Sequence, residues 1–361
     1  MLTLNYLQKN IKNKYKYIII YLSLFILILL LYNIYDKYNK YYKYIYIENF
    51  NPPTYKTLIS NWDNGSGFYS ELAFKLNHYL YCKKYNLNFK TNSNNWPYKF
   101  KHGWTDYFEN IELRLNNDFD NNDPTLIHYE NGCCSILEKF KLKDYVNAIH
   151  EYYNYTPTIQ NIINKKKESI GLINNNYGCI YIRRGDKLLT EIEFIHTDKF
   201  IDKLINIYPD CKTIFLQTDD YNCFIDLQNY IKDKNLNITA ITLCPENNFG
   251  SIAHGGYAKQ MNDNHHNNKE YLEKIKQNLS KPISDMTPEE KYEHTLELIT
   301  SVDICINSKY CVCDYKSNVS RFIKFAHKNI MNVFDISNGD TLFDLDSYKT
   351  IGFDFDSHLN S

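Results

Sequence analysis

The sequence is poor in the residues that interrupt regular structure: its 361 positions hold only 12 glycines and 9 prolines, and no internal repeat is visible. These shortages argue against collagen-like and low-complexity chains. An excess of charge is also missing, since 41 lysines and arginines stand against 42 aspartates and glutamates, for a net charge of -1. A strongly basic nucleic-acid binder is therefore disfavoured. With 43% hydrophobic residues, the length suits about two globular domains.

The ten cysteines lack the spacing of a metal site, because neither a Cys-x-x-Cys pair nor a Cys/His ligand pattern occurs. Cys179 and Cys305 stand in apolar stretches, where a small buried hydrophobic side chain is the favoured interpretation. Ten cysteines are also compatible with disulfides in an oxidising compartment. The sequence predicts no zinc site and leaves the disulfide pairing open.

An apolar run without charge covers residues 17–35 and would span about 28 Å as a helix, close to the ~30 Å hydrocarbon thickness of a bilayer. A cleaved signal peptide would need small residues after the run, which instead ends in Tyr-Asn-Ile-Tyr. The sequence therefore predicts a transmembrane signal anchor at 17–35, preceded by a short cytoplasmic tail at 1–16 and followed by a stalk at 36–56.

The charges around this run favour a cytoplasmic N-terminus, because four lysines precede it, whereas Asp36 accompanies the lysines that follow. We expect a single-pass type II membrane protein whose globular part is lumenal, in the Golgi or ER, or extracellular. Sequons in such a compartment predict a glycoprotein. They occur at Asn64, Asn154, Asn237, Asn278 and Asn318, of which the first and last lie inside motifs described below and are expected to stay unmodified.

The remaining chain alternates short apolar runs with helical patterns. A strand is predicted at 57–62, a glycine turn and a helix with apolar spacing near 3.6 at 70–85, loops at 112–135 and mostly helix at 136–170. A basic run, Lys165 to Lys167, closes this part. We place a domain boundary there, between an N-terminal α/β domain at 57–165 and a C-terminal Rossmann-like domain at 166–361.

The second half predicts a parallel sheet of Rossmann type, because its strands are separated by amphipathic helices. The predicted strands lie at 177–182, 213–217 and 302–307, and the predicted helices at 198–208, 223–234, 288–300 and 317–328, with an aperiodic loop at 245–269. The fold class is therefore α/β with two Rossmann-like domains.

Two arginines follow the strand at 177–182 directly. Because ligands of an open parallel sheet bind at the carboxyl ends of its strands, Arg183, Arg184 and Lys187 would project where a diphosphate can lie. Arginine forks bind phosphate oxygens and stabilise a departing diphosphate. The alternative is a solvated loop end or an Arg-Asp ion pair.

Other candidate residues occur at neighbouring strand and helix ends. Glu191 could accept a proton from an acceptor hydroxyl, although surface glutamates are common. Asp219 and Asp220 follow the strand at 213–217 and could orient an arginine or bind sugar hydroxyls, or simply cap a helix. Ser317 and Asn318 open a helix, whose N-terminus is a second phosphate contact or an ordinary cap. Gly65 and Gly67 allow close approach of a ligand or make a tight turn.

These motifs together resemble a known family. YIRRGDKLLTE at 181–191 resembles the arginine-pair motif of the α-1,6-fucosyltransferases and of the related bacterial nodulation and animal protein O-fucosyltransferases. FLQTDD at 215–220 and VDICINSKYCVCDYKSNVSR at 302–321 are similar to the following strand with paired aspartates and to the later strand with its Ser-rich phosphate loop. NGSGFYSELAFKLNHYLYC at 64–82 and GWTDYF at 103–108 are similar to the glycine turn, helix and Gly-Trp segment. The resemblance covers most of residues 60–330, in order.

The resemblance implies a GT-B-like, metal-independent, inverting fucosyltransferase that moves fucose from GDP-fucose to a hydroxyl of a glycan or glycoprotein. The domain at 57–165 would then lie on the acceptor side and the domain at 166–361 would bind the nucleotide sugar. Arg183 would bind the β-phosphate and Glu191 would be the general base. Arg184, Asp186 and Lys187 would organise that pair, and neither a metal nor a resident cofactor is implied. The donor pocket would be completed by Asp219, Asp220, Ser317 and Asn318, with Gly65 and Gly67 in the first domain.

Three positions depart from the family pattern. Tyr181 stands where the α-1,6 enzymes usually have His, Gly185 replaces their Thr, and Thr295 occupies the position of a guanine-binding acid, with Glu293, His294 and Glu297 nearby. The donor base is therefore less certain than the phosphate site. Two alternatives stay open: the same fold using another nucleotide sugar, and a catalytically inactive, membrane-tethered carbohydrate-binding protein.

Overall fold

The structure is a computed structural model of the chain. It describes residues 57–62, 67–110, 112, 127–129, 139–185, 187–190, 193–250, 281–336, 345–346 and 348–349. The chain divides into two units, residues 1–54 and residues 55–361, and all described residues belong to the second. The cytoplasmic tail, anchor and stalk expected from the sequence lie outside the described residues. Within the described part of the chain, no helix is both long and apolar enough to cross a membrane.

The first half of the described chain contains β1 (Thr57–Asn61), α2 (Phe68–Tyr85), β2 (Asn88–Asn92), a 3-10 helix (Trp104–Asp106), β3 (Ile127–Tyr129), β4 (Phe140–Lys141), α3 (Leu142–Tyr152) and α4 (Pro157–Ser169). β1 pairs in parallel with β2 and with β3, giving the strand order β2-β1-β3. β3 falls in a segment for which the sequence predicts only loops. β4 pairs antiparallel with β10 (Tyr348–Lys349) in a separate ribbon.

Helix α2 is buried on nearly every side from Phe68 to Cys82, including Lys75 and His78. The sequence predicts a helix here but suggests a single apolar face. The difference arises because α2 contacts β1 and β2 as well as α3 and α10, so protein covers it on several sides.

The second half contains β5 (Gly178–Ile182), α5 (Lys187–Thr190), α6 (Thr197–Ile207), β6 (Thr213–Thr218), α7 (Asn222–Asp233), β7 (Thr239–Ile241), α9 (Pro288–Ile306), β8 (Tyr310–Cys313), α10 (Asn318–Ala326) and β9 (Val333–Asp335), with 3-10 helices at Ile283–Asp285 and Ile330–Asn332. The strands form a five-stranded parallel sheet in the order β7-β6-β5-β8-β9. All strands run in the same direction, but the order in which the chain adds them reverses at β5: β6 and β7 are added on one side of it, and β8 and β9 on the other. In doubly wound sheets, ligands bind at this switch point, beyond the carboxyl ends of the strands.

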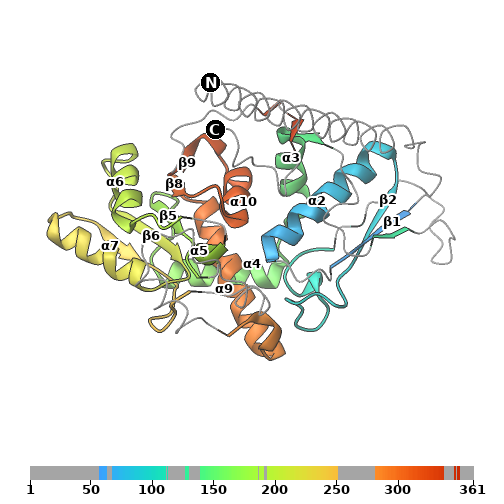
Figure 1. The fold of residues 1–361 in the computed structure, drawn as a ribbon, viewed down its shortest axis with the longest axis horizontal. Coiled ribbons are helices and arrows are strands. Elements are labelled where there is room, and N and C mark those ends of the chain that lie inside the picture. The colour runs from blue at the N-terminus through green and yellow to red at the C-terminus, as the bar shows by residue number, and fades with distance from the viewer. Residues whose placement is uncertain are drawn as a thin grey trace, which may run out of the picture. The chain divides into compact units, whose positions relative to one another are not determined.

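The two faces of this sheet are covered by different helices (Figure 1). Ile180, Ile182 and Val312 pack in a core with residues of α6 and α7. Alternate strand residues point to the opposite face, where Cys179 and Tyr181 belong to a larger core that also contains residues of α2, α9 and α10. The predicted strands at 177–182 and 213–217 and the predicted helices at 198–208 and 223–234 are confirmed to within about two residues.

The strand predicted at 302–307 is wrong, because these residues form the last turns of α9. Residues Ser301 to Cys305 are all buried, so the helix has no polar face there and its sequence pattern cannot be told from that of a buried strand. The fourth strand of the sheet is instead β8, which the sequence treats as a connecting stretch. β8 is buried between β5 and β9.

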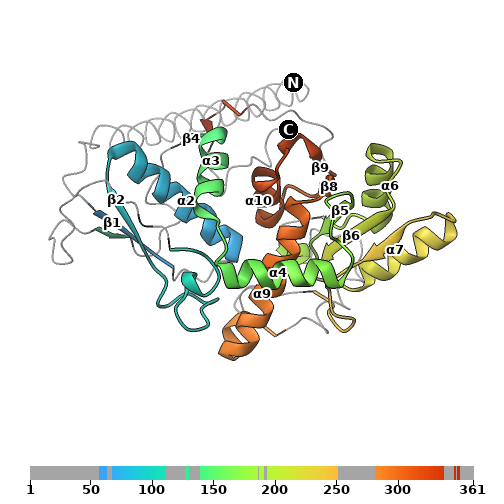
Figure 2. The ribbon, with the colours of Figure 1, turned by 180° about the vertical axis from the view of Figure 1, so that it is seen from behind.

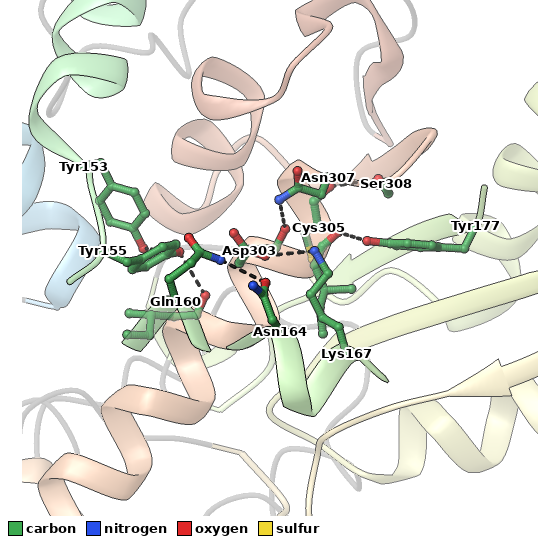
Figure 3. Close-up of polar contacts among 12 residues, drawn as sticks. Tyr153, Tyr155, Gln160, Asn164, Lys167, Tyr177, Asp303, Cys305, Asn307 and Ser308 are labelled. Atoms are coloured by element: carbon green, nitrogen blue, oxygen red, sulfur yellow. Dashed lines mark hydrogen bonds and ion pairs between the residues drawn. The ribbon is translucent and has the colours of Figure 1, made fainter. Parts of the chain in front are cut away.

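Helix α4 crosses α9 and is fixed to it by polar contacts (Figure 2 and Figure 3). Lys167 at the end of α4 pairs with the buried Asp303 at 3.2 Å. The Tyr177 hydroxyl donates to the carbonyl of Ile304 at 2.8 Å. Burial raises the pKa of Asp303, and the Lys167 ammonium opposes that increase. The domain boundary placed at residues 165 and 166 falls inside α4; the division into two domains stays a prediction.

Candidate functional site

The arginine pair and the aspartate pair meet at the carboxyl edge of the five-stranded sheet. Ile182, the last residue of β5, lies in register with Thr218, the last residue of β6, so the next residues of both strands are neighbours. The Arg183 guanidinium forms an ion pair with the carboxylate of Asp219. The backbone N–H of Arg184 donates to the other oxygen of that carboxylate at 2.7 Å. One aspartate thus fixes both residues of the arginine pair.

The two arginines have different surroundings. Arg184 is 2% exposed, donates from Nη2 to the carbonyl of Ile195 at 2.5 Å and lies 4.5 Å from the ring centre of Phe194. It therefore ties the segment before α6 to the end of β5. The Arg183 side chain keeps 14% of its surface exposed, which makes it the better candidate for contact with a ligand.

The turn after the arginine pair requires glycine. Gly185 has a φ of 55°, in the left-handed region that a residue with a Cβ adopts at a cost. The chain therefore turns at Gly185 before α5. Lys187 is the first residue of α5.

Asp220 is buried to 1% exposure beside the arginine pair. Its Oδ1 accepts hydrogen bonds from the backbone and side-chain nitrogens of Asn222, both at 2.9 Å, in the turn that leads into α7; the N-cap of that helix is Tyr221, not Asp220. Burial raises the pKa of Asp220 to about 6, and the neighbouring Asp219 adds to the increase. Its Oδ2 has no hydrogen-bond partner among the described residues.

The loop after β8 joins the same edge of the sheet. Ser317 precedes the first residue of α10, Asn318, but its side chain makes no capping hydrogen bond; its Oγ lies 3.4 Å from the hydroxyl of Tyr181 on β5. Tyr181 therefore connects the strand before the arginine pair to the loop that precedes α10. The N-terminus of α10 is a place where backbone N–H groups favour an anion.

Three further groups belong to this edge. Asp314 follows β8, and burial raises its pKa, with the charge of Arg184 acting in the opposite direction. On α9, burial and the nearby Arg183 lower the pKa of His294. The side chain of Glu297 is exposed, but neighbouring protein atoms partly desolvate its carboxyl group and raise its pKa to about 7. The positive charge of Lys166 opposes this increase.

Sequence reasoning misses Asp314, although it carries the same signal as Arg183 and Asp219, a polar residue directly after a buried strand. It names His294 and Glu297 only as neighbours of Thr295. The proximity of His294 to Arg183 depends on how α9 packs against the sheet, which no local pattern reveals.

Gly67 is the residue before α2. Two residues later, the ring of Tyr69 packs on Phe322 of α10 at 4.6 Å, so the first turn of α2 reaches α10. Gly65, Asp186 and Glu191, the expected general base, lie outside the described residues. In the described part of the chain, no group of three or more His, Cys, Asp or Glu side chains is arranged to hold a metal ion.

Comparisons with known proteins find similarity in structure only. No family model matches the sequence, and no curated protein matches it. The structure is similar to that of the NodZ alpha-1,6-fucosyltransferase soaked with GDP-fucose, with a TM-score of 0.49 and 11% sequence identity, over 80% of this chain and 98% of that chain. It is similar to the fucosyltransferase NodZ from Bradyrhizobium with a TM-score of 0.49 and 10% identity, over the same shares of the two chains. At these TM-scores and identities, the similarity assigns neither a fold family nor an activity to this chain.

Taken by itself, the edge of the sheet combines a partly exposed guanidinium, a helix N-terminus and several buried carboxyl groups. Such a set can bind a phosphate-bearing ligand through Arg183 and the N-terminus of α10, and it can hydrogen-bond polar hydroxyls through the carboxyl groups. The α/β fold with parallel sheets, and the position of these groups at its switch point, are what the structure establishes.

Proposed function

We propose that the chain is a glycosyltransferase that binds a nucleoside diphosphate sugar at the carboxyl edge of the five-stranded sheet. The observation that carries this proposal is the position of Arg183: it follows the central strand β5, at the switch point, and Asp219 holds its guanidinium in place. A positioned arginine at this point suits a diphosphate, because a rigid fork binds two phosphate oxygens at once.

The most specific form of the proposal is an inverting, metal-independent fucosyltransferase that uses GDP-fucose and a glycan or glycoprotein hydroxyl. It is supported by the order and spacing of the motifs that resemble the α-1,6-fucosyltransferases. In this reaction, Arg183 and the N-terminus of α10 would stabilise the negative charge that develops on the leaving GDP. Glu191 would take the proton of the attacking hydroxyl, while Arg184 would position the chain that follows Glu191 through Phe194 and Ile195.

We further propose that residues 17–35 anchor the enzyme as a single-pass type II membrane protein with its globular part lumenal or extracellular. The uncharged apolar run of about 28 Å supports this topology. The nucleotide sugar and the acceptor would then meet the enzyme on the same side of the membrane as the sequons.

A second donor stays possible within the same fold. Thr295, at the position of the family's guanine-binding acid, is fully buried, whereas Glu297, two residues further along α9, is exposed. This difference favours a base contact unlike that of the α-1,6 enzymes, and it keeps other nucleotide sugars as alternatives. A membrane-tethered carbohydrate-binding protein without turnover is the remaining alternative.

The test compares thermal stabilisation of the full-length chain, in mild detergent and EDTA, by GDP, UDP, CMP and ADP. We expect GDP to raise the melting temperature most. Arg183→Lys, which keeps the charge but loses the fork, should weaken GDP binding about 10- to 100-fold, as expected for a charge-assisted hydrogen-bonding pair. Lys212→Ala, an exposed cation just before β6 at the opposite edge of the sheet, is the matched control and should bind GDP like the wild type.

Turnover is tested by incubation with GDP-fucose and a panel of acceptors. The fucosyltransferase proposal expects fucose transfer that Glu191→Gln abolishes while GDP binding persists. Preference for UDP that requires a divalent metal contradicts the donor assignment, and GDP binding without any consumption of GDP-fucose favours the inactive carbohydrate-binding protein.

A further inference from the structure

Four thiols gather on one face of the five-stranded sheet. Cys179 of β5 lies in register with Cys311 of β8, and Tyr181 with Cys313. Because alternate strand residues share a face, these three cysteines point to the same side of the sheet, where Cys305 of α9 meets them in the larger core. All four side chains are fully buried.

We call Cys179, Cys305, Cys311 and Cys313 the thiol cluster. The sulfurs of Cys179 and Cys305 are 3.0 Å apart. The thiol of Cys311 interacts electrostatically with those of the other three cysteines. Burial as small hydrophobic side chains explains why each cysteine is inside, but it does not explain why four of them gather in one place.

A tetrahedral zinc site does not fit this cluster. Two thiolates at 2.3 Å from a zinc ion are about 3.8 Å apart, well beyond the contact between Cys179 and Cys305. None of the described groups of His, Cys, Asp and Glu is arranged as a metal site. The contact is instead that of two thiols poised to bond to each other.

We propose that Cys179 and Cys305 form a disulfide bond when the chain folds in an oxidising compartment. The oxidant is a disulfide donor, such as oxidised glutathione or the disulfide of an oxidoreductase. The thiolate of one cysteine attacks a donor sulfur and releases one donor thiol. The second cysteine then loses its proton, attacks the mixed disulfide and releases the other donor thiol. Two protein thiols are oxidised and one donor disulfide is reduced to two thiols.

This pairing is favoured over the alternatives within the thiol cluster. The sulfurs of Cys179 and Cys305 are in direct contact at 3.0 Å, so the folded chain brings these two thiols within reach of each other. Cys311 and Cys313 are two residues apart on one strand, and a bond between them would distort a strand that pairs on both sides.

The bond would join two elements that carry the candidate site. Cys179 lies on β5, which ends at Arg183, and Cys305 lies on α9, beside the contact of Asp303 with Lys167 (Figure 3). The two cysteines are 126 residues apart, so the bond would close a long loop of the unfolded chain. Because both thiols are inaccessible in the folded protein, the exchange must take place before α9 packs on the sheet, and the finished bond should resist reductants in the native state.

The sequence allows an unambiguous test. Full-length protein from the secretory compartment of a eukaryotic host is unfolded with N-ethylmaleimide, digested with trypsin without reductant and analysed by mass spectrometry. Trypsin cleaves at Lys309, which separates Cys305 (peptide 292–309) from Cys311 and Cys313 (peptide 310–316), while Cys179 lies in peptide 168–183. We expect 168–183 joined to 292–309, and two N-ethylmaleimide groups on 310–316.

Three results would overturn the proposal: N-ethylmaleimide on all four cysteines, a bond from either partner to peptide 310–316, or a bond within that peptide.

A second experiment avoids dependence on the compartment: reduced, unfolded chain is refolded with a glutathione redox pair and digested in the same way. The refolding experiment measures only the state of the thiols, so its outcome does not depend on whether GDP or any other nucleotide binds.

Two cysteine variants distinguish the effect of the disulfide bond from the effect of removing a buried side chain. With the bond present, heating with a strong reductant should lower the melting temperature of the wild type by at least about 5 °C, as expected for a bond that closes a long loop. Cys305→Ala should lose this dependence on reductant. Cys82→Ala, which removes a fully buried thiol of α2 outside the thiol cluster, should retain it. An equal response of both variants would contradict the pairing.

Discussion

At the level of single residues, the candidate site depends on Asp219, which contacts the Arg183 guanidinium with one oxygen and the Arg184 backbone with the other. The carboxylate therefore sets the direction of the partly exposed arginine and the course of the chain after it. Asp220, the next residue, has a different role: its carboxyl group is buried and its pKa is raised to about 6. Two adjacent aspartates thus have different surroundings: the first pairs with an arginine and the second is buried with a raised pKa.

This difference gives a pH prediction for Asp220→Asn. Between about pH 4 and 6, folded Asp220 keeps a proton that the unfolded chain loses, so the free energy of unfolding of the wild type falls as the pH rises through this range. Asparagine does not titrate, so the variant does not lose this stability. The free energy of unfolding of the variant minus that of the wild type should therefore increase by up to about 3 kcal/mol between pH 4 and pH 7.5.

Urea denaturation at pH values from 4 to 7.5 measures this difference. Asp210→Asn, in an exposed turn before β6, is the control and should follow the wild-type curve. Parallel pH profiles for Asp220→Asn and the wild type would mean that Asp220 has the same pKa in the folded and the unfolded protein, which would contradict the prediction.

At the level of elements, α9 decides how the site is assembled. Its middle carries His294 and Glu297 near the edge of the sheet, and its last turns carry Asp303 and Cys305 into the core. The helix is held by α4 through Lys167, which belongs to the basic run that the sequence assigns to a domain boundary. The basic run therefore includes a structural residue.

Lys167→Ala should destabilise the protein by about 3 kcal/mol at pH 8, because it leaves the buried carboxylate of Asp303 without its cation. The pKa of Asp303 is already raised by burial and should rise further in the variant. The folded variant then takes up a proton as the pH falls, so its defect should be smaller at pH 5 than at pH 8.

Chemical denaturation of Lys167→Ala at the two pH values tests this expectation. Lys165→Ala removes an exposed lysine from the same helix and should change the free energy of unfolding by less than about 0.5 kcal/mol. Equal losses for the two variants would show that Lys167 contributes only as a surface charge.

At the level of the whole molecule, one core connects the two parallel sheets between residues 57 and 336. Phe322 of α10 packs against Tyr69 of α2 and Tyr153 after α3, with ring centres 4.6 Å apart in both pairs. The same core contains Leu58 of β1 and Cys311 of β8. We therefore expect both sheets to unfold in one transition, although the sequence suggests two domains.

Phe322→Ala should lower the free energy of unfolding by about 3 to 5 kcal/mol and shift the transitions of both sheets together. The three tryptophans report on the first sheet alone, since Trp62 follows β1 and lies 5.0 Å from both Trp96 and Trp104 in ring centres. Hydrogen exchange of peptides from β5 and β8 reports on the second sheet.

The control for this prediction is Ile225→Ala, which removes a side chain of α7 that is 42% exposed and should leave both transitions nearly unchanged. Separate midpoints for tryptophan fluorescence and for exchange in β5 would contradict a single cooperative unit and would favour two domains that unfold independently.

The sequence by itself determines the alternation of strands and helices around β5 and β6, and it points to Arg183, Arg184, Asp219 and Ser317. It can do so because amphipathic helices and polar residues directly after buried strands are local patterns. It does not determine that residues 302–306 are helical, since a helix buried on all sides has no periodic signature. It also does not reveal that Asp314 and His294 lie near the arginine pair or that Cys179 meets Cys305, because each of these contacts joins residues more than a hundred positions apart. Only the packing of α9 and β8 against β5 brings them together.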